Sequence, residues 1–323
     1  MKAIRFAKTG GPEVLSLQDI ALPPPAQGQV RIRHTAIGVN FIDTYHRSGL
    51  YPLPLPSGLG LEAAGTVESL GAGVTSLKIG DRVGYCTGPV GAYAEANNVP
   101  ADRVVKLPAS VGGDVAAAAM LKGMTAQYLL KRTFAVQRGQ AILFHSAAGG
   151  VGLIAVQWAK HMGAQVIGTV GSDSKIELAK AHGCDQVFNI EKDDWVAGVR
   201  ELTNGAGVPV VYDSIGKDTF MGSLDCLSPR GMMVSFGNSS GAVPPFEPAL
   251  LSAKGSLYLT RPTLMHYTRT ARELQETADD LFAVIGSGAV KIAVNQRFAL
   301  ADARAAHEAL HSRKTTGATV LIP

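Results

Sequence analysis

A glycine-rich segment, FHSAAGGVG at residues 144–152, has the residue types of a phosphate-binding loop. It follows the apolar run AILF and opens the amphipathic stretch VGLIAVQWAK, which is the strand, loop and helix order of a dinucleotide fingerprint. Gly149 allows close approach of the backbone and Gly152 allows close packing, although Ala147 replaces the first glycine of the pattern. Helix N-termini attract anions. The segment therefore predicts that Gly149, Gly150 and Val151 hold a pyrophosphate.

The cofactor preference depends on the residues after the next apolar run, VIGTV, where Gly171-Ser172-Asp173-Ser174-Lys175 follow. An acidic residue at the tip of that strand would accept a hydrogen bond from the ribose 2′-hydroxyl of NAD. Here small side chains leave room for a phosphate and Lys175 supplies a cation, which favours NADPH. In the alternative interpretation Lys175 is an ordinary solvated residue and Asp173 only caps a helix.

Histidine and cysteine side chains suggest no nucleophile, because no Ser/His/Asp arrangement can be read from the sequence. We expect core or surface roles for His34, His46 and His145. The three cysteines are far apart in the chain, which predicts small buried side chains in a reducing compartment rather than disulfides. They are Cys86, Cys184 and Cys226.

Six short apolar runs between residues 140 and 262 alternate with stretches of helical periodicity, and this predicts a doubly wound parallel sheet of the α/β class. The first 110 residues are instead divided by glycine and proline into short β-type segments. Two helices and a final strand follow Pro262, and we expect this tail to return to the first domain. The predicted domains are 1–122 with 263–323, and 123–262.

The charge and hydropathy of the whole chain exclude other classes of protein. Among 323 residues, 30 basic and 26 acidic side chains are scattered and give a net charge of +4, so no nucleic-acid-binding face is expected. No window approaches about 18 uncharged apolar residues, and the N-terminus has no apolar core of a signal peptide. We expect a cytoplasmic protein with no membrane segment.

Long collinear motifs give the chain a family resemblance. It resembles the medium-chain dehydrogenase/reductase superfamily, and within it the zinc-free bacterial NADPH:quinone oxidoreductases related to zeta-crystallin. The resemblance implies a six-stranded Rossmann domain with NADPH and a β-rich GroES-like catalytic domain. The motifs are GGPEVL, GVNFIDTYHRSGLYP, PSGLGLEAAGTV, GDRV, LKGMTAQYLL, FHSAAGGVG, VVYDSIG, MVSFGNSSG and SLYLTRP.

The resemblance also implies that no metal is bound. Zinc-dependent members of the superfamily have a cysteine in the segment matching GVNFIDTY and a histidine in a Gly-His-Glu triplet. This chain has Asn40 in the first segment and Leu61 in the second, and leucine cannot bind a metal. The closely spaced cysteines of a structural zinc site are absent as well.

The same resemblance assigns site residues. It implies that Asn40, Asp43 and Tyr45 form the catalytic pocket, without naming a general acid. Close relatives have a tyrosine near the adenosine 2′-phosphate where this chain has Ile190, so more of the phosphate binding would depend on Ser172, Lys175 and Arg313. The remaining implied cofactor contacts are Phe41, Ile42, Thr125, Tyr128, Gly171, Ser214, Phe236, Gly237, Ser239 and Leu264.

The resemblance predicts a metal-free, NADPH-dependent reduction of quinones in a cleft between the two domains, by a homodimer that pairs through SLYLTRP. Three alternatives stay open. One is an NADPH-dependent reductase of the C=C bond of alkenals or enones. The second is an NADPH-binding protein with a crystallin-like or RNA-binding role, and the third is a zinc alcohol dehydrogenase.

Overall fold

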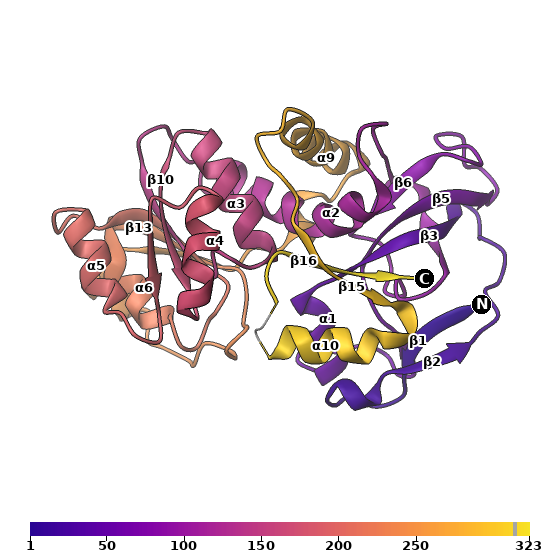
Figure 1. Ribbon diagram of the computed structural model, residues 1–323, viewed down its shortest axis with the longest axis horizontal. Helices are drawn as coiled ribbons and strands as arrows, with labels where there is room; N and C mark the ends of the chain where they lie inside the picture. Colours follow the sequence, from indigo (N-terminus) through magenta and orange to yellow (C-terminus); the bar gives the residue numbers. More distant parts are fainter. Residues whose placement is uncertain (313–314) are drawn as a thin grey trace. The chain divides into compact units, whose positions relative to one another are not determined.

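The computed structural model describes residues 1–312 and 315–323 (Figure 1). Contacts between residues divide the chain into two compact units, which we describe separately. The first consists of Met1–Met124, Tyr267–Gly286 and Ile292–Pro323, and the second of Thr125–His266 and Ser287–Lys291. The boundary between the first and second units lies after residue 124, where the sequence predicts it after residue 122. The return to the first unit comes after residue 266, where the sequence predicts it after residue 262. The inclusion of residues 287–291 in the second unit was not expected.

The second unit contains a six-stranded parallel sheet in the order β11-β10-β9-β12-β13-β14. The order reverses beside β9, as in a doubly wound nucleotide-binding fold, and this confirms the predicted fold class. The six predicted apolar runs provide the six strands. They are β9 (Ala141–Phe144), β10 (Gln165–Val170), β11 (Gln186–Asn189), β12 (Val208–Asp213), β13 (Leu227–Ser235) and β14 (Tyr258–Thr260).

Helices follow the strands of this sheet. Because crossovers between parallel strands are right-handed, the reversal beside β9 places α3 and α4 on one face and α6 on the other. Helices α5 and α6 contact each other (Figure 1). Trp195 of α5 lies against Gly222 of α6. The helices are α3 (Gly150–His161), α4 (Ile176–Ala181), α5 (Trp195–Leu202), α6 (Phe220–Cys226), α7 (Ala249–Ala253) and α8 (Leu264–Tyr267).

The first unit is built on a mostly antiparallel sheet in the order β15-β16-β3-β5-β6-β8, with β7 also paired to β3. A smaller sheet has the order β2-β1-β4. The strands are β1 (Lys2–Phe6), β2 (Ser16–Asp19), β3 (Gln29–Val39), β4 (Ser57–Gly58), β5 (Glu62–Leu70), β6 (Arg82–Tyr85), β7 (Ala96–Pro100), β8 (Val105–Lys106), β15 (Val294–Ala299) and β16 (Ala318–Ile322). The helices are α1 (Phe41–Ser48), α9 (Ala271–Gly286), α10 (Ala303–His311) and most of α2 (Gly113–Tyr128).

The C-terminal tail returns to the first unit, as predicted. Strand β16, yellow in Figure 1, pairs antiparallel with the indigo β3, and Val320 lies opposite Gly38. The sequence analysis missed β15, which pairs parallel with β16. Its side chains alternate between partly buried and exposed, and its sequence VNQRFA has too few apolar residues to stand out as a strand.

Apolar side chains hold each unit together. In the first unit, Ile32, Ile37 and Tyr85 lie in a core that also receives Leu310 from α10. In the second, Leu143 and Val211 lie in the centre of the sheet under helix residues such as Leu224. Burial of each side chain of this size stabilises the fold by about 1.5–3 kcal/mol. Across residues 1–312 and 315–323, no helix combines the length and the hydropathy that a membrane crossing requires.

Candidate active site

The glycine-rich loop between β9 and α3 accommodates Ala147 without strain. The left-handed residue of the loop is Ser146, whose φ is 55°, so Ala147 itself needs no glycine. The Ala147 N–H donates to the Thr169 carbonyl oxygen at 2.9 Å. Opposite it, β10 has Gly168, where an added Cβ would lie 2.9 Å from the Ala147 Cβ. The methyl group that replaces the first glycine is therefore offset by a glycine in the neighbouring strand.

The N-terminus of α3 suits a pyrophosphate. Gly149 is the N-cap in an extended conformation, and because glycine has no side chain it leaves the first N–H groups of the helix without a side-chain cap. Gly149, Gly150 and Val151 are partly exposed. A Cβ at Gly152 would lie 2.7 Å from the Ala147 carbonyl carbon, so this glycine packs against the loop itself. Open N–H groups at a positive helix end can bind two phosphates.

The tip of β10 presents small and cationic residues, as predicted. Gly171 is exposed, and an added Cβ there would meet no atom within 4 Å; Ser172 and Lys175 are partly exposed. Asp173 is not a helix N-cap, which corrects the alternative interpretation. Its carboxylate instead pairs with the Lys192 ammonium and accepts from the Asn189 amide at 2.6 Å. These two partners lower the pKa of Asp173 and offset its negative charge at the tip of β10.

The ends of β12 and β13 bring together four predicted cofactor residues. The Ser239 N–H donates to the Ser214 carbonyl oxygen at 3.2 Å, and a Cβ at Gly237 would lie 2.8 Å from the Ser214 Cα. The Phe236 ring lies 5.8 Å from the Phe144 ring of β9. The carboxyl ends of parallel strands are where nucleotides bind in this fold.

Three buried polar side chains behind this edge have a structural role. His145 contacts Thr169 Oγ1 at 2.8 Å and Ser223 Oγ at 3.0 Å, and Ser223 donates to Asp213 at 3.0 Å. The sequence analysis did not foresee this Asp-Ser-His contact. All three side chains are fully buried, and the serine lies between the aspartate and the histidine. In a catalytic triad the histidine lies between the other two, so this arrangement does not activate the serine as a nucleophile. The predicted core role of His145 is confirmed.

In the first unit, the N-terminus of α1 presents the segment from Asn40 to Tyr45. The Asn40 N–H donates to Asp43 Oδ2 at 2.8 Å, so the carboxylate caps the helix. Phe41 is exposed and Ile42 and Tyr45 are partly exposed, with the Tyr45 ring 5.3 Å from another aromatic ring, that of Tyr51. The side chains of Phe41, Ile42 and Tyr45 are therefore open to a ligand, while Asp43 is buried.

The Asn40 amide is held by a buried carboxylate that the sequence analysis did not single out. Asn40 Nδ2 donates to Glu62 Oε2 at 2.8 Å, and the Lys122 ammonium lies 3.3 Å from the same oxygen. Glu62 Oε1 accepts from the Leu121 N–H at 2.6 Å. Glu62 is fully buried and the Lys122 side chain is 7% exposed. This cluster, Asn40-Glu62-Lys122, connects β5 and α2 to the end of β3.

Asp43 ends a second buried chain of hydrogen bonds. Arginine only donates, so the Arg47 guanidinium, 2.9 Å from His307 Nδ1, makes that nitrogen an acceptor. Burial lowers the pKa of His307 to about 3, so the neutral ring carries its proton on Nε2 and donates it to Tyr93 Oη at 3.0 Å. The Tyr93 hydroxyl then donates to Asp43 Oδ2 at 3.0 Å. Burial raises the pKa of Asp43 to about 7, and its Oδ1 has no hydrogen-bond partner within the described chain.

His307 also belongs to the segment HEALH at 307–311, a spacing that can bind zinc and that the sequence analysis passed over. The structure gives His307 two protein partners, and His311 is exposed at the end of α10. Nowhere in residues 1–312 and 315–323 do three or more His, Cys, Asp or Glu side chains gather as a metal site would need. The three cysteines are free and buried, as predicted.

The other predicted contacts lie in or beside the second unit. Tyr128 and Leu264 are buried and Thr125 is partly exposed. Ile190 follows β11 and donates its N–H to the Val170 carbonyl oxygen at the tip of β10. Arg313 lies outside the described residues.

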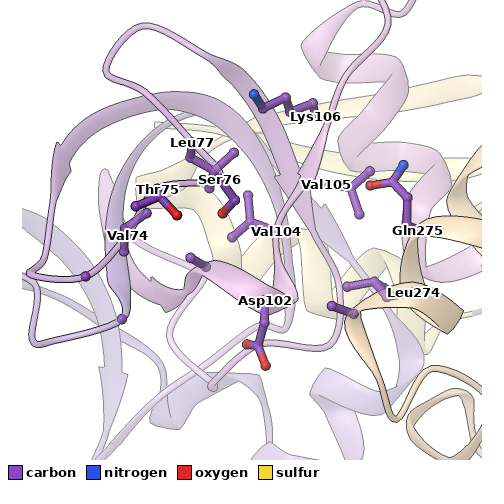
Figure 2. Close-up of a pocket in the computed structure, with 14 residues that line it drawn as sticks. Val74, Thr75, Ser76, Leu77, Asp102, Val104, Val105, Lys106, Leu274 and Gln275 are labelled. Atoms are coloured by element: carbon purple, nitrogen blue, oxygen red, sulfur yellow. The ribbon is translucent and has the colours of Figure 1, made fainter.

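A hollow of about 810 Å³ in the first unit is not the candidate site. It is lined by the turn with Val74 and Leu77, by the segment from Asp102 to Lys106, and by Leu274 and Gln275 of α9 (Figure 2). None of the predicted site residues lines it, and it holds no cluster of chemically reactive side chains.

Sequence signals for the missed residues exist in part. Lys122 is the only charged residue in the run VAAAAMLKGMTAQYLL. A lone charge in an apolar helix indicates a buried side chain that needs a partner. Glu62, Tyr93 and His307 carried no such signal, because their partners are far away in the sequence.

Comparison with known proteins decides the family. Residues 26–109 match the alcohol dehydrogenase GroES-like domain, and residues 150–283 match the zinc-binding dehydrogenase family. Over its full length the chain is 54% identical to a quinone oxidoreductase of Pseudomonas aeruginosa, covering 100% of this chain and 99% of the relative. The chain belongs to the quinone oxidoreductases of the medium-chain dehydrogenase/reductase superfamily.

Two further relatives of this quinone oxidoreductase chain bear on its function. A 2-haloacrylate reductase of Burkholderia sp. is 46% identical, over 98% of this chain and 97% of the relative. The crystal structure of the Escherichia coli quinone oxidoreductase complexed with NADPH has a TM-score of 0.99, with 51% identity and 100% of each chain covered.

Proposed function

We propose that this protein is an NADPH-dependent quinone reductase. The observation that carries the proposal is its full-length similarity, at 51% identity, to a quinone oxidoreductase crystallised with NADPH. The glycine-rich loop and the open N-terminus of α3 support the pyrophosphate part of this proposal. The small residues and Lys175 beyond β10 support the 2′-phosphate part.

Bound NADPH supplies the hydride, and the residues of this chain bind and orient it. We propose that Gly149, Gly150 and Val151 hold the pyrophosphate, and that Ser172 and Lys175 hold the 2′-phosphate beside Gly171. The ends of β12 and β13 would contact the ribose and the nicotinamide. The proposed contacts there and around the nicotinamide are Ser214, Phe236, Gly237, Ser239, Leu264, Thr125 and Tyr128.

In the first unit, we propose that the open side chains of the α1 N-terminus contact the acceptor. Phe41, Ile42 and Tyr45 offer apolar and aromatic surface for a flat ring. Asn40 offers an amide whose orientation is fixed by Glu62. A pocket of this kind accelerates hydride transfer by proximity and orientation, which suits an acceptor whose carbonyls are already electron-poor.

The test is a steady-state comparison of acceptors with purified protein. We expect turnover of 1,4-benzoquinone with NADPH, much slower turnover with NADH, and no loss of activity after treatment with EDTA. Absence of quinone turnover with either cofactor would refute the proposal. Loss of activity on chelation, restored by zinc, would indicate a zinc dehydrogenase instead.

A reductase of activated C=C bonds is the second candidate, because a 2-haloacrylate reductase matches the whole chain at 46% identity. Both reactions use the same cofactor and a flat, electron-poor acceptor. Measuring kcat/KM for 2-chloroacrylate and an alkenal beside 1,4-benzoquinone separates them. A higher value for the alkene would favour the second candidate.

We also propose a cytoplasmic homodimer that binds no metal. The free, buried cysteines suit a reducing compartment. Strand β14 is the edge of its sheet and has an exposed Tyr258, so it can pair with the same strand of a second copy. Leu61, buried beside Glu62, cannot bind a metal at the position where zinc-dependent relatives have a histidine.

A further inference from the structure

Lys122 is a buried cation with few partners. It lies in α2 among fully buried residues such as Ala119 and Met120, and its own side chain is 7% exposed. Within residues 1–312 and 315–323, Glu62 Oε2 is the one hydrogen-bond acceptor of its ammonium group, at 3.3 Å. An ammonium group has three N–H donors. No described residue accepts from the other two donors of this nearly buried charge, so they are available to a ligand.

Stability alone does not explain this lysine. Removal of an ion from water costs several kcal/mol, and an apolar residue of similar volume often gives an equally stable or more stable protein. Glu62 has other donors, since Asn40 Nδ2 lies 2.8 Å and the Leu121 N–H 2.6 Å from its oxygens. The carboxylate could thus be satisfied without the ammonium, and a buried charge at a proposed active site points to function.

The position of Lys122 places its charge beside the proposed acceptor site. Its ammonium and the Asn40 amide contact the same Glu62 oxygen, so the two donors are neighbours. Two neighbouring ionisable groups respond to this pair of charges. Burial has the largest effect and raises the pKa of both Asp43 and Cys86, while the charge of Glu62 raises and that of Lys122 lowers each of them. Lys122 therefore supplies a positive charge next to the Asn40 amide.

We propose that Lys122 is a catalytic residue that hydrogen-bonds the carbonyl oxygen of the acceptor and donates a proton to it. The inference rests on the proposed reductase function. The cofactor C–H bond breaks and its hydride forms an O–H bond at one oxygen of the quinone, so the acceptor is reduced while the cofactor is oxidised. The negative charge develops on the other oxygen, and the Lys122 N–H bond breaks as the second O–H bond of the hydroquinone forms there. The neutral Lys122 amine then takes a proton from water. Glu62 holds the lysine side chain in position throughout.

The decisive variant is the double substitution Lys122→Met with Glu62→Gln, which removes the proton donor without leaving an unpaired buried carboxylate. We expect kcat with 1,4-benzoquinone to fall about 10²–10³-fold, as on removal of one oxyanion donor, with NADPH affinity and unfolding temperature unchanged. The single variant Glu62→Gln, which keeps the ammonium, is expected to be less impaired. Lys78→Met, at an exposed lysine of the same unit, is the matched control.

The choice of acceptor separates catalysis from a structural role. Hydroquinones with electron-withdrawing substituents are stronger acids, so their formation depends less on a proton donor. We therefore expect the double variant to lose much more rate with tetramethyl-1,4-benzoquinone than with tetrachloro-1,4-benzoquinone. Equal losses with both acceptors would overturn the proposal, because a damaged fold does not distinguish them.

A binding measurement tests the same contact without turnover. The probe is 4-nitrophenol, whose phenolate resembles a hydroquinone anion and is detected by its visible absorption. Wild-type protein is expected to bind the phenolate and lower the apparent pKa of the phenol, and the double variant to lose this shift. A shift of equal size in both proteins would overturn the role of Lys122. If the wild type reduces no quinone, the proposed function fails whatever the phenol result.

Discussion

Two buried carboxylates of the first unit have different surroundings and therefore different uses. Glu62 receives hydrogen bonds at both oxygens from an amide, a backbone N–H and an ammonium. Asp43 receives them only at Oδ2, from the Asn40 N–H and the Tyr93 hydroxyl. Its buried Oδ1 has no partner in the described chain. Glu62 is thus suited to hold a charged partner, and Asp43 to carry a proton itself.

The buried Asp43 predicts a pH dependence of stability. Its pKa is about 7 in the fold and 3.8 as a free side chain, so the folded protein binds this proton more tightly and stability falls as pH rises from about 4 to about 7. Asp43→Asn should remove this contribution. We expect the loss of unfolding free energy between pH 5 and pH 8 to be about 2 kcal/mol smaller in the variant, measured by urea unfolding. The exposed Asp279→Asn is the control, and equal losses in wild type and Asp43→Asn would contradict the assignment.

Lys175, which follows β10, predicts a preference for NADPH over NADH. Lys175→Ala should weaken NADPH binding by about 10- to 100-fold and leave NADH binding nearly unchanged, because only NADPH has a 2′-phosphate for the ammonium. Dissociation constants from fluorescence titration of each cofactor provide the test. Lys180→Ala removes a nearby exposed lysine that pairs with Glu177, and it should change neither constant. Equal losses for both cofactors would exclude contact with the 2′-phosphate.

At the scale of elements, the loop between β9 and α3 depends on the strand beside it. Ala147 fits because Gly168 of β10 has no side chain, and Ser146 takes the left-handed conformation that another loop would give to glycine. The helix can then begin at Gly150 with its first N–H groups open. Strand, loop and helix therefore form one phosphate-binding element, although one glycine of the pattern is missing.

The close packing inside this element predicts the effect of Gly152→Ala. The added methyl group would meet backbone atoms of Ser146 and Ala147, which cannot move away as a flexible side chain can. We expect a loss of about 1–3 kcal/mol in unfolding free energy and a weaker affinity for NADPH and NADH alike. Gly286→Ala, where no atom lies within 4 Å of the new carbon, is the control. Unchanged binding in Gly152→Ala would show that the loop tolerates displacement.

At the scale of the whole molecule, each unit has its own sheet, and the chain returns to the first sheet after completing the second. Strand β16 adds to β3 and is followed outward by β15, so the C-terminal segment completes the first unit. The second sheet ends at β14, whose outer edge pairs with no other described strand. An open edge with exposed Tyr258 and Leu259 is a surface on which a second copy can add its own strand.

This edge predicts the oligomeric state. We expect a dimer by light scattering at micromolar concentration. Tyr258→Lys should give a monomer, because each copy would bring an added charge to the shared edge. The unfolding temperature, measured at low concentration, should change little since Tyr258 is 60% exposed within one chain. A monomeric wild type would refute the dimer, and a dimeric variant would place its interface elsewhere.

The sequence by itself determined the elements whose signals are local. Apolar runs fixed the six strands of the second unit, and the glycines fixed the loop before α3, because strand length and turn conformation depend on neighbouring residues. Only the tertiary structure decided which distant side chains meet. Lys122 contacts Glu62 from 60 residues away, and His307 contacts Tyr93 from 214 residues away. Burial and hydrogen-bond partners set the chemistry of these groups, and both exist only after the sheets have formed.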